Sequence, residues 1–210
     1  MSSDLFVTGT DTNVGKTVLS ALLVAALDGT YWKPIQTGSS EGTDRQSVMR
    51  MAELPDERTL PECYCFEPPV SPHLAAKKAG VGIRLDRIRK PPVASKGPLI
   101  VEGAGGVLVP INEAQLMLDL IKHLSMPVVI ASRSSLGTIN HTLLTVKALR
   151  DAGAEIRGVV MIGKDNRDNE RAVEHYGKVP IAGRIPVLEK IDRASLLSTF
   201  RSEFDAKYFQ

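Results

Sequence analysis

Short apolar runs alternate with longer segments of helical character along the whole chain. Runs typical of buried strands occur at residues 5–7, 30–35, 99–101, 127–131, 156–162 and 180–185. Segments with helical composition or spacing occur at 18–27, 44–51, 71–78, 84–89, 114–124, 138–152, 169–176 and 193–204. This alternation predicts an α/β fold with a doubly wound, mostly parallel sheet. Residues 54–72 are rich in proline and lack a clear period, which predicts an irregular surface segment.

The composition is that of one ordinary globular domain. The chain has 210 residues, of which 43% are hydrophobic and 24% charged, so we expect a single domain over 1–210. A net charge of +2 argues against a nucleic-acid surface. No apolar run reaches the roughly 18 residues of a membrane span and no secretory signal pattern opens the chain, which predicts a cytoplasmic protein. Cys63 and Cys65 lack the spacing of a metal or disulfide motif and are expected to be free thiols.

Residues 9–17, with the sequence Gly-Thr-Asp-Thr-Asn-Val-Gly-Lys-Thr, predict a phosphate-binding loop between the first strand and the first helix. Glycines let backbone N–H groups approach phosphates at a helix N-terminus. Lys16 supplies a positive charge for the terminal phosphates, and the Thr17 hydroxyl is a ligand for the Mg²⁺ that bridges them. The loop is one residue longer than the simplest template, because Gly9 stands one position early.

Two further charged residues, Lys33 and Glu102, fit a nucleotide site. Lys33 follows a strand, at the edge where open α/β sheets bind their ligands, although a solvated surface lysine is an equal alternative. Glu102 ends a buried strand and precedes glycines, so its carboxylate can reach a nucleotide-bound Mg²⁺. Asp44 begins a helix and by itself needs no other role. His73, near the proline-capped start of another helix, is interpreted as structural.

Five blocks together resemble the dethiobiotin synthetase family over the whole chain. They are residues 9–17, 32–38, 71–73, 102–106 and 136–141. The longer phosphate loop is that family's own form. The resemblance implies a three-layer P-loop NTPase fold and a Mg²⁺-dependent reaction in which ATP drives 7,8-diaminopelargonic acid and CO₂ (or bicarbonate) to dethiobiotin through a carbamate and its phosphorylated anhydride. It also implies a homodimer with the active site near the subunit interface. The charge and the apolar runs described above predict neither a nucleic acid nor a membrane as partner.

The resemblance assigns roles position by position. It assigns catalysis to Lys16, Lys33 and Thr12. It assigns nucleotide binding to Asn13, Val14, Gly15, Lys16, Thr17, Val18, Gly163, Asn166, Pro186 and Glu189. It assigns substrate binding to Thr12, Lys33, Thr37, Gly105, Leu136, Gly137 and Asn140. It assigns the Mg²⁺ ligands to Thr17, Asp44 and Glu102.

The chain departs from the family pattern at two places. Thr37 stands where serine is common and keeps the hydroxyl. Residues 161–164, Met-Ile-Gly-Lys, replace the usual adenine-reading asparagine, which predicts weak discrimination among nucleotide bases unless Asn166 takes over that role.

Two other functions are compatible with the same fold class. A partitioning or assembly ATPase that acts as a switch usually has a lysine early in the loop, and residues 10–14 contain none. Cobyrinate amidotransferase chemistry needs a further glutaminase domain, for which 210 residues leave no room.

Overall fold

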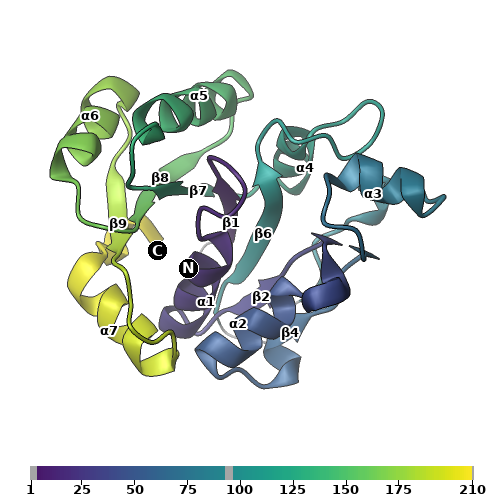
Figure 1. Ribbon diagram of the computed structural model, residues 1–210, viewed down its shortest axis with the longest axis horizontal. Coiled ribbons are helices and arrows are strands. Elements are labelled where there is room, and N and C mark those ends of the chain that lie inside the picture. The colour runs from purple at the N-terminus through teal and green to yellow at the C-terminus, as the bar shows by residue number, and fades with distance from the viewer. Residues whose placement is uncertain (1–3, 93–96, 210) are drawn as a thin grey trace.

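A seven-stranded parallel sheet forms the centre of the computed structural model, which describes residues 4–92 and 97–209 (Figure 1). In spatial order its strands are β4 (Thr59–Leu60), β2 (Thr30–Trp32), β6 (Leu99–Gly106), β1 (Leu5–Gly9), β7 (Val128–Arg133), β8 (Ile156–Ile162) and β9 (Ile181–Ile185). Every pairing between these strands is parallel. The predicted parallel sheet is therefore confirmed.

Helices cover both faces of the sheet, as the sequence predicts. One face carries α1 (Lys16–Ala26), α2 (Asp44–Ala52) and α7 (Arg193–Glu203). The other carries α3 (Pro72–Lys78), α4 (Met117–Leu124), α5 (Thr138–Asp151) and α6 (Arg167–Gly177). The helix α1 is apolar almost all round because it lies between the sheet and the helices α2 and α7.

Pro34 divides the predicted second strand. Proline has no N–H to donate to a sheet ladder, so β2 ends at Trp32 and a separate strand, β3 (Ile35–Thr37), begins after it. The strand β3 pairs in parallel with β5 (Tyr64–Phe66) in a second, two-stranded sheet. This small sheet supports the segment that carries Gln36 and Thr37.

Three sequence predictions are wrong in detail. Residues 54–72 are not wholly irregular, because they contain β4 and β5. Residues 84–89 form only the 3₁₀ turn Leu85–Arg87. Leu85 and Ile88 are three positions apart, so a single turn is enough to bury both side chains and a longer helix is not required. The helix predicted from residue 114 begins at Met117, because side chains of Asn112 and Asp119 accept the backbone N–H groups of residues 114–116 and fix a turn there.

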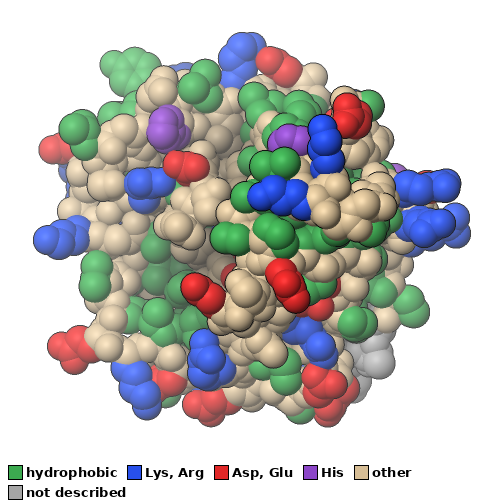
Figure 2. All heavy atoms as spheres, turned by 45° about the vertical axis from the view of Figure 1, so that its right-hand side comes forward, with side chains coloured by type: hydrophobic (Ala, Val, Ile, Leu, Met, Phe, Trp, Pro, Cys, Tyr) green, Lys and Arg blue, Asp and Glu red, His purple; other side chains and the backbone are tan. Residues whose placement is uncertain are grey.

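The described surface mixes charges of both signs. On the face in Figure 2, Lys and Arg side chains are interspersed with Asp and Glu side chains, in agreement with the near-neutral net charge of +2. Cys63 and Cys65 are exposed free thiols, as predicted. Within residues 4–92 and 97–209, no helix has the length and apolar character needed to cross a membrane.

Candidate active site

The phosphate loop joins the end of β1 to the start of α1 and is tightly packed. Gly15 has a φ of 98°, in the left-handed region, and a Cβ there would lie 2.9 Å from a side-chain carbon of Ile162. A Cβ on Gly9 would lie 2.8 Å from the carbonyl oxygen of Asp11. The side chain of Lys16 folds back over the loop, where its Nζ donates to that same carbonyl at 2.9 Å. Both glycines are therefore required by the loop geometry.

Four polar side chains from separate segments meet beside this loop. The Thr17 hydroxyl lies 2.8 Å from Oδ1 of Asp44 and 3.1 Å from Oε1 of Glu102. The Nζ of Lys33 lies 2.5 Å from Oδ2 of Asp44 and 3.0 Å from Oε1 of Glu102. Asp44 is thus more than a helix-start acid, and Lys33, whose side chain is only 7% exposed, is not a solvated surface lysine.

Sheet register and helix capping explain how the chain brings these groups together. Trp32 pairs with Val101 across β2 and β6, so the next residues, Lys33 and Glu102, are neighbours at the carboxyl edge. Asp44 is fixed as the first residue of α2 by the capping box of Thr43. Its backbone N–H also donates to Oε1 of Gln36 at 3.1 Å. The contacts among the four side chains are therefore set by elements far apart in sequence.

Two residues of this cluster were missed by the sequence prediction. Tyr31 is fully buried and donates its hydroxyl to Oε2 of Glu102 at 3.0 Å. Gln36 is buried and orients Asp44 through the contact described above. Strand alternation offered a signal for Tyr31, because it precedes Lys33 by two positions and so faces the same side.

Burial and charge change the protonation of these groups. Burial lowers the pKa of Lys16 to about 8. Burial also opposes the charge on Lys33, but the carboxylates of Glu102 and Asp44 outweigh it and raise the pKa of this lysine. For Asp44, burial is outweighed by Lys33, which lowers the pKa of the carboxyl. Burial and the charge of Glu102 raise the pKa of Tyr31 well above its ordinary value, so its hydroxyl remains a donor.

A cleft of about 890 Å³ opens over this cluster at the carboxyl edge of the sheet. Its lining includes the predicted site residues Thr12, Asn13, Gly15, Lys16, Thr17, Val18, Lys33, Thr37, Asp44, Glu102 and Gly105. Val14 is buried in the core beneath the loop instead. Ser71 also lines the cleft, and its Oγ lies 3.0 Å from Nδ1 of the exposed His73. One cleft therefore collects the phosphate loop, the carboxylates and most of the predicted substrate residues.

The remaining predicted site residues lie outside this cleft. Leu136, Gly137 and Asn140 are at the exposed start of α5, and the Leu136 side chain is 99% exposed. Gly163 and Asn166 line a separate hollow of about 440 Å³ beyond β8, where Asn166 caps α6 by accepting the N–H of Asn169. Pro186 and Glu189 are exposed after β9.

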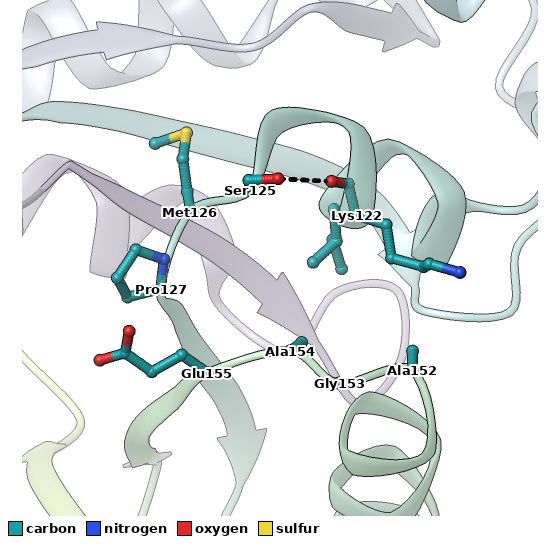
Figure 3. Close-up of a pocket in the computed structure, with 9 residues that line it drawn as sticks. Lys122, Ser125, Met126, Pro127, Ala152, Gly153, Ala154 and Glu155 are labelled. Atoms are coloured by element: carbon teal, nitrogen blue, oxygen red, sulfur yellow. Dashed lines mark hydrogen bonds between the residues drawn. The ribbon is translucent and has the colours of Figure 1, made fainter.

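Another hollow, of about 330 Å³, lies at the opposite edge of the sheet, where β7 and β8 begin (Figure 3). It is formed by the turn after α4 and the turn after α5, and the Ser125 hydroxyl in it donates to the carbonyl oxygen of Lys122 at 2.8 Å. Its charged residues, Lys122 and Glu155, are exposed. No predicted site residue lines this hollow, and its polar groups do not converge.

The donor set beside the phosphate loop fits a hard divalent cation. Asp44, Glu102 and Thr17 offer oxygen atoms, the ligand type that Mg²⁺ prefers. The single proton of the Thr17 hydroxyl points toward a carboxylate, which leaves lone pairs of Oγ1 for a cation. In the part of the chain that the structure describes, there is no group of three or more His, Cys, Asp or Glu residues that could hold a metal ion.

The chain matches one family model and many known proteins along nearly its whole length. A model of the family described as AAA domain matches residues 3–195. The ATP-dependent dethiobiotin synthetase of Rhodopseudomonas palustris (strain HaA2) is 46% identical over 209 residues, which cover 100% of this chain and 97% of the relative. That of Nitrobacter hamburgensis is 47% identical over 204 residues, covering 97% of this chain and 95% of the relative.

Solved structures share the fold at much lower identity. A ParA family ATPase from Chlorobium tepidum has a TM-score of 0.55 at 16% identity and covers 94% of this chain and 89% of its own. A MinC:MinD cell division complex from Aquifex aeolicus gives a TM-score of 0.56 at 13% identity, with coverages of 94% and 86%. These likenesses concern the P-loop fold alone. The full-length similarity to the synthetases is specific, and the chain belongs to the dethiobiotin synthetase family.

Proposed function

We propose that the protein closes the ureido ring of dethiobiotin from 7,8-diaminopelargonic acid, CO₂ and ATP, with Mg²⁺ as cofactor. One amine takes up CO₂ as a carbamate, and a carbamate oxygen accepts the γ-phosphoryl group of ATP. The second amine then attacks the carbonyl carbon, the bond from that carbon to the phosphate oxygen breaks, and the amine releases a proton. The observation that carries the proposal is the meeting of Lys16, Lys33, Asp44 and Glu102 in one cleft.

The phosphate loop binds ATP in this proposal. Lys16 places its ammonium on the β- and γ-phosphates, and the loop residues from Asn13 to Val18 surround them. Thr17, Asp44 and Glu102 would hold Mg²⁺, which would supply positive charge to the phosphates when bound. Burial lowers the pKa of Lys16 in the free protein. Bound phosphates would favour the charged form of this lysine and so raise its pKa again.

Lys33 and Thr12 act on the carbamate. Lys33 keeps its positive charge because two carboxylates stabilise it, and its ammonium lines the cleft. Charge accumulates on adjacent oxygens as the carbamate is phosphorylated, and a fixed ammonium in a partly enclosed site stabilises that charge. Thr12, Thr37 and Gly105 line the same cleft and bind the substrate beside it. No protein nucleophile is needed.

The proposed function can be tested directly. Protein, ATP, Mg²⁺, bicarbonate and 7,8-diaminopelargonic acid are mixed, and dethiobiotin is detected by mass spectrometry. We expect product only when all components are present, with one ADP formed per dethiobiotin. ATP hydrolysis that proceeds equally without the diamine, and gives no dethiobiotin, would instead favour a nucleotide switch.

We further propose a homodimer in which Leu136, Gly137 and Asn140 complete the neighbouring subunit's substrate site. The exposed start of α5 supports this, since these residues do not line their own cleft. Mixing Lys16→Ala with Asn140→Ala protein should restore part of the activity that neither homodimer has, because one site per mixed dimer is then intact. Sedimentation that shows only monomers at assay concentration would contradict the dimer.

Weak discrimination among nucleotide bases is expected. Gly163 offers only backbone to a base, and the side-chain oxygen of Asn166 is engaged in capping α6. A site without a base-reading amide leaves fewer buried polar groups unpaired with the wrong base. We expect kcat/KM for ATP, GTP and CTP to agree within about tenfold, and an ATP preference beyond about a hundredfold would contradict this. Loss of such a preference in Asn166→Ala would identify the reader.

The lowered pKa of Lys16 predicts a pH dependence. In the free protein Lys16 is charged below its pKa of about 8 and neutral above it. Because kcat/KM reports the free protein, we expect kcat/KM for ATP to fall as the pH rises through this value. Bound phosphates favour the charged lysine, so kcat should persist to higher pH. Equal kcat/KM values at pH 7 and at about pH 9.5 would contradict this assignment.

A further inference from the structure

The carboxylate of Glu102 has a partner on each of its two oxygens. Oε1 receives the Thr17 hydroxyl and the Lys33 ammonium, at 3.1 and 3.0 Å. Oε2 accepts the Tyr31 hydroxyl at 3.0 Å. Glu102 is 1% exposed and Tyr31 is 0% exposed, so neither group has access to water as a replacement partner. Thr17 and Lys33 thus define the side of the carboxylate that faces the cleft, and Tyr31 defines its back.

The Tyr31 hydroxyl is held in place by the core. Tyr31 lies in β2 directly beside Ile100 of β6, two residues before Glu102. Its ring packs in the cluster under α1 and α2, together with Leu5 and Val7. A ring fixed on all sides leaves its hydroxyl little freedom to move away from Oε2. The hydrogen bond is therefore a rigid link between the apolar core and the carboxylate.

We propose that Tyr31 is a positioning residue that orients Glu102 so that Oε1 faces Thr17 and the bound cation. This inference rests on the proposed function, specifically on Glu102 as a ligand of Mg²⁺. Without the hydroxyl, Oε2 becomes a buried acceptor with no partner, which carries a large desolvation penalty. Rotation of the carboxylate toward Lys33 relieves that penalty and takes Oε1 away from Thr17.

The variant Tyr31→Phe removes the hydroxyl and keeps the ring that fills the core. The matched control is Tyr64→Phe, because the Tyr64 hydroxyl accepts the Arg84 N–H at 3.1 Å and Tyr64 does not line the cleft. The probe is Mn²⁺, titrated in the presence of ADP and followed by electron paramagnetic resonance. We expect Tyr31→Phe to weaken Mn²⁺ binding about tenfold, the usual effect of losing the hydrogen-bond partner of a ligand, and Tyr64→Phe to leave it unchanged.

Turnover provides a second readout. If Tyr31 acts through cation binding, Tyr31→Phe raises the Mg²⁺ concentration that gives half-maximal activity, while kcat at saturating Mg²⁺ stays within about threefold of wild type. A lowered kcat that Mg²⁺ does not restore would overturn the proposal. Loss of the wild-type circular dichroism spectrum would overturn it as well, since the hydroxyl would then support the fold rather than the carboxylate.

A double-mutant cycle separates this inference from the proposed function. Because Tyr31 acts through Glu102, adding Tyr31→Phe to Glu102→Gln should cause little further loss of Mn²⁺ affinity. Additive losses would overturn the role of Tyr31 while keeping Glu102 as a ligand. Wild-type Mn²⁺ affinity in Glu102→Gln alone would instead show that the proposed metal ligands are wrong, and with them the inference built upon them.

Discussion

Replacing Lys16 by alanine is expected to lower kcat by at least about 10²-fold, the effect of deleting one preorganised charge-stabilising group. Lys16 lies at the start of α1, is 6% exposed, and is held against the phosphate loop by the carbonyl of Asp11. The proposed contact of Lys16 with the γ-phosphate would strengthen as charge moves during the transfer, so we expect the loss to appear in kcat and not only in KM. Single-turnover formation of ADP measures this step directly.

Stability measurements separate a catalytic loss from misfolding. The lowered pKa of Lys16 means that the folded state favours the neutral amine, so the buried charge opposes folding below pH 8 and this penalty lessens as the pH rises above it. Lys16→Ala removes that charge and should unfold at or above the wild-type temperature at pH 7. Lys122→Ala, at the far edge of the sheet, is the matched control and should keep wild-type kcat. A Lys16→Ala protein with more than half of wild-type kcat would contradict the proposed function.

The parts of the fold that could be predicted are those with local signals. The phosphate loop carries its chemistry within nine residues, 9–17, and the long strands β6, β7 and β8 each contain a continuous apolar run, at 99–101, 128–131 and 159–162. The strands β4 and β5 were missed because they are two and three residues long, too short for periodicity to show. Their existence depends on pairing with β2 and β3, which is a property of the folded chain.

The residues of the site also divide into those with local sequence signals and those that depend on long-range contacts. The presence of Thr17 and Glu102 in the cleft could be predicted from their neighbours in sequence. The roles of Lys33 and Asp44 were ambiguous from local sequence, because long-range contacts decide them. Lys33 contacts Glu102, 69 residues away, and Asp44 contacts Lys33 and Thr17. Tyr31 looked like one more apolar strand residue, and only the register of β2 against β6 shows what its hydroxyl meets. Long-range register is the information that a single sequence lacks.

Glu102→Gln is expected to lower kcat/KM for Mg·ATP by at least about tenfold and to raise the Mg²⁺ requirement, because an amide is a poorer ligand for a hard cation than a carboxylate. Glutamine has nearly the same shape as glutamate, but the groups around residue 102 do not suit an amide. Thr17, Tyr31 and Lys33 all donate to Glu102, so the amide NH₂ of glutamine would face at least one donor. Lys33 would also lose one of its two carboxylates.

Asp44→Asn provides the comparison, since Asp44 is more exposed, with 28% of its side chain accessible against none for Glu102. Water can replace part of what Asp44 contributes, so we expect the same direction of change with a smaller magnitude. Mg²⁺ titrations of the initial rate measure both variants under one protocol. A wild-type Mg²⁺ curve for Asp44→Asn alone would show that Asp44 only holds Lys33. A wild-type curve for Glu102→Gln would contradict the role of Glu102 as a metal ligand, and with it the proposed Mg²⁺ site.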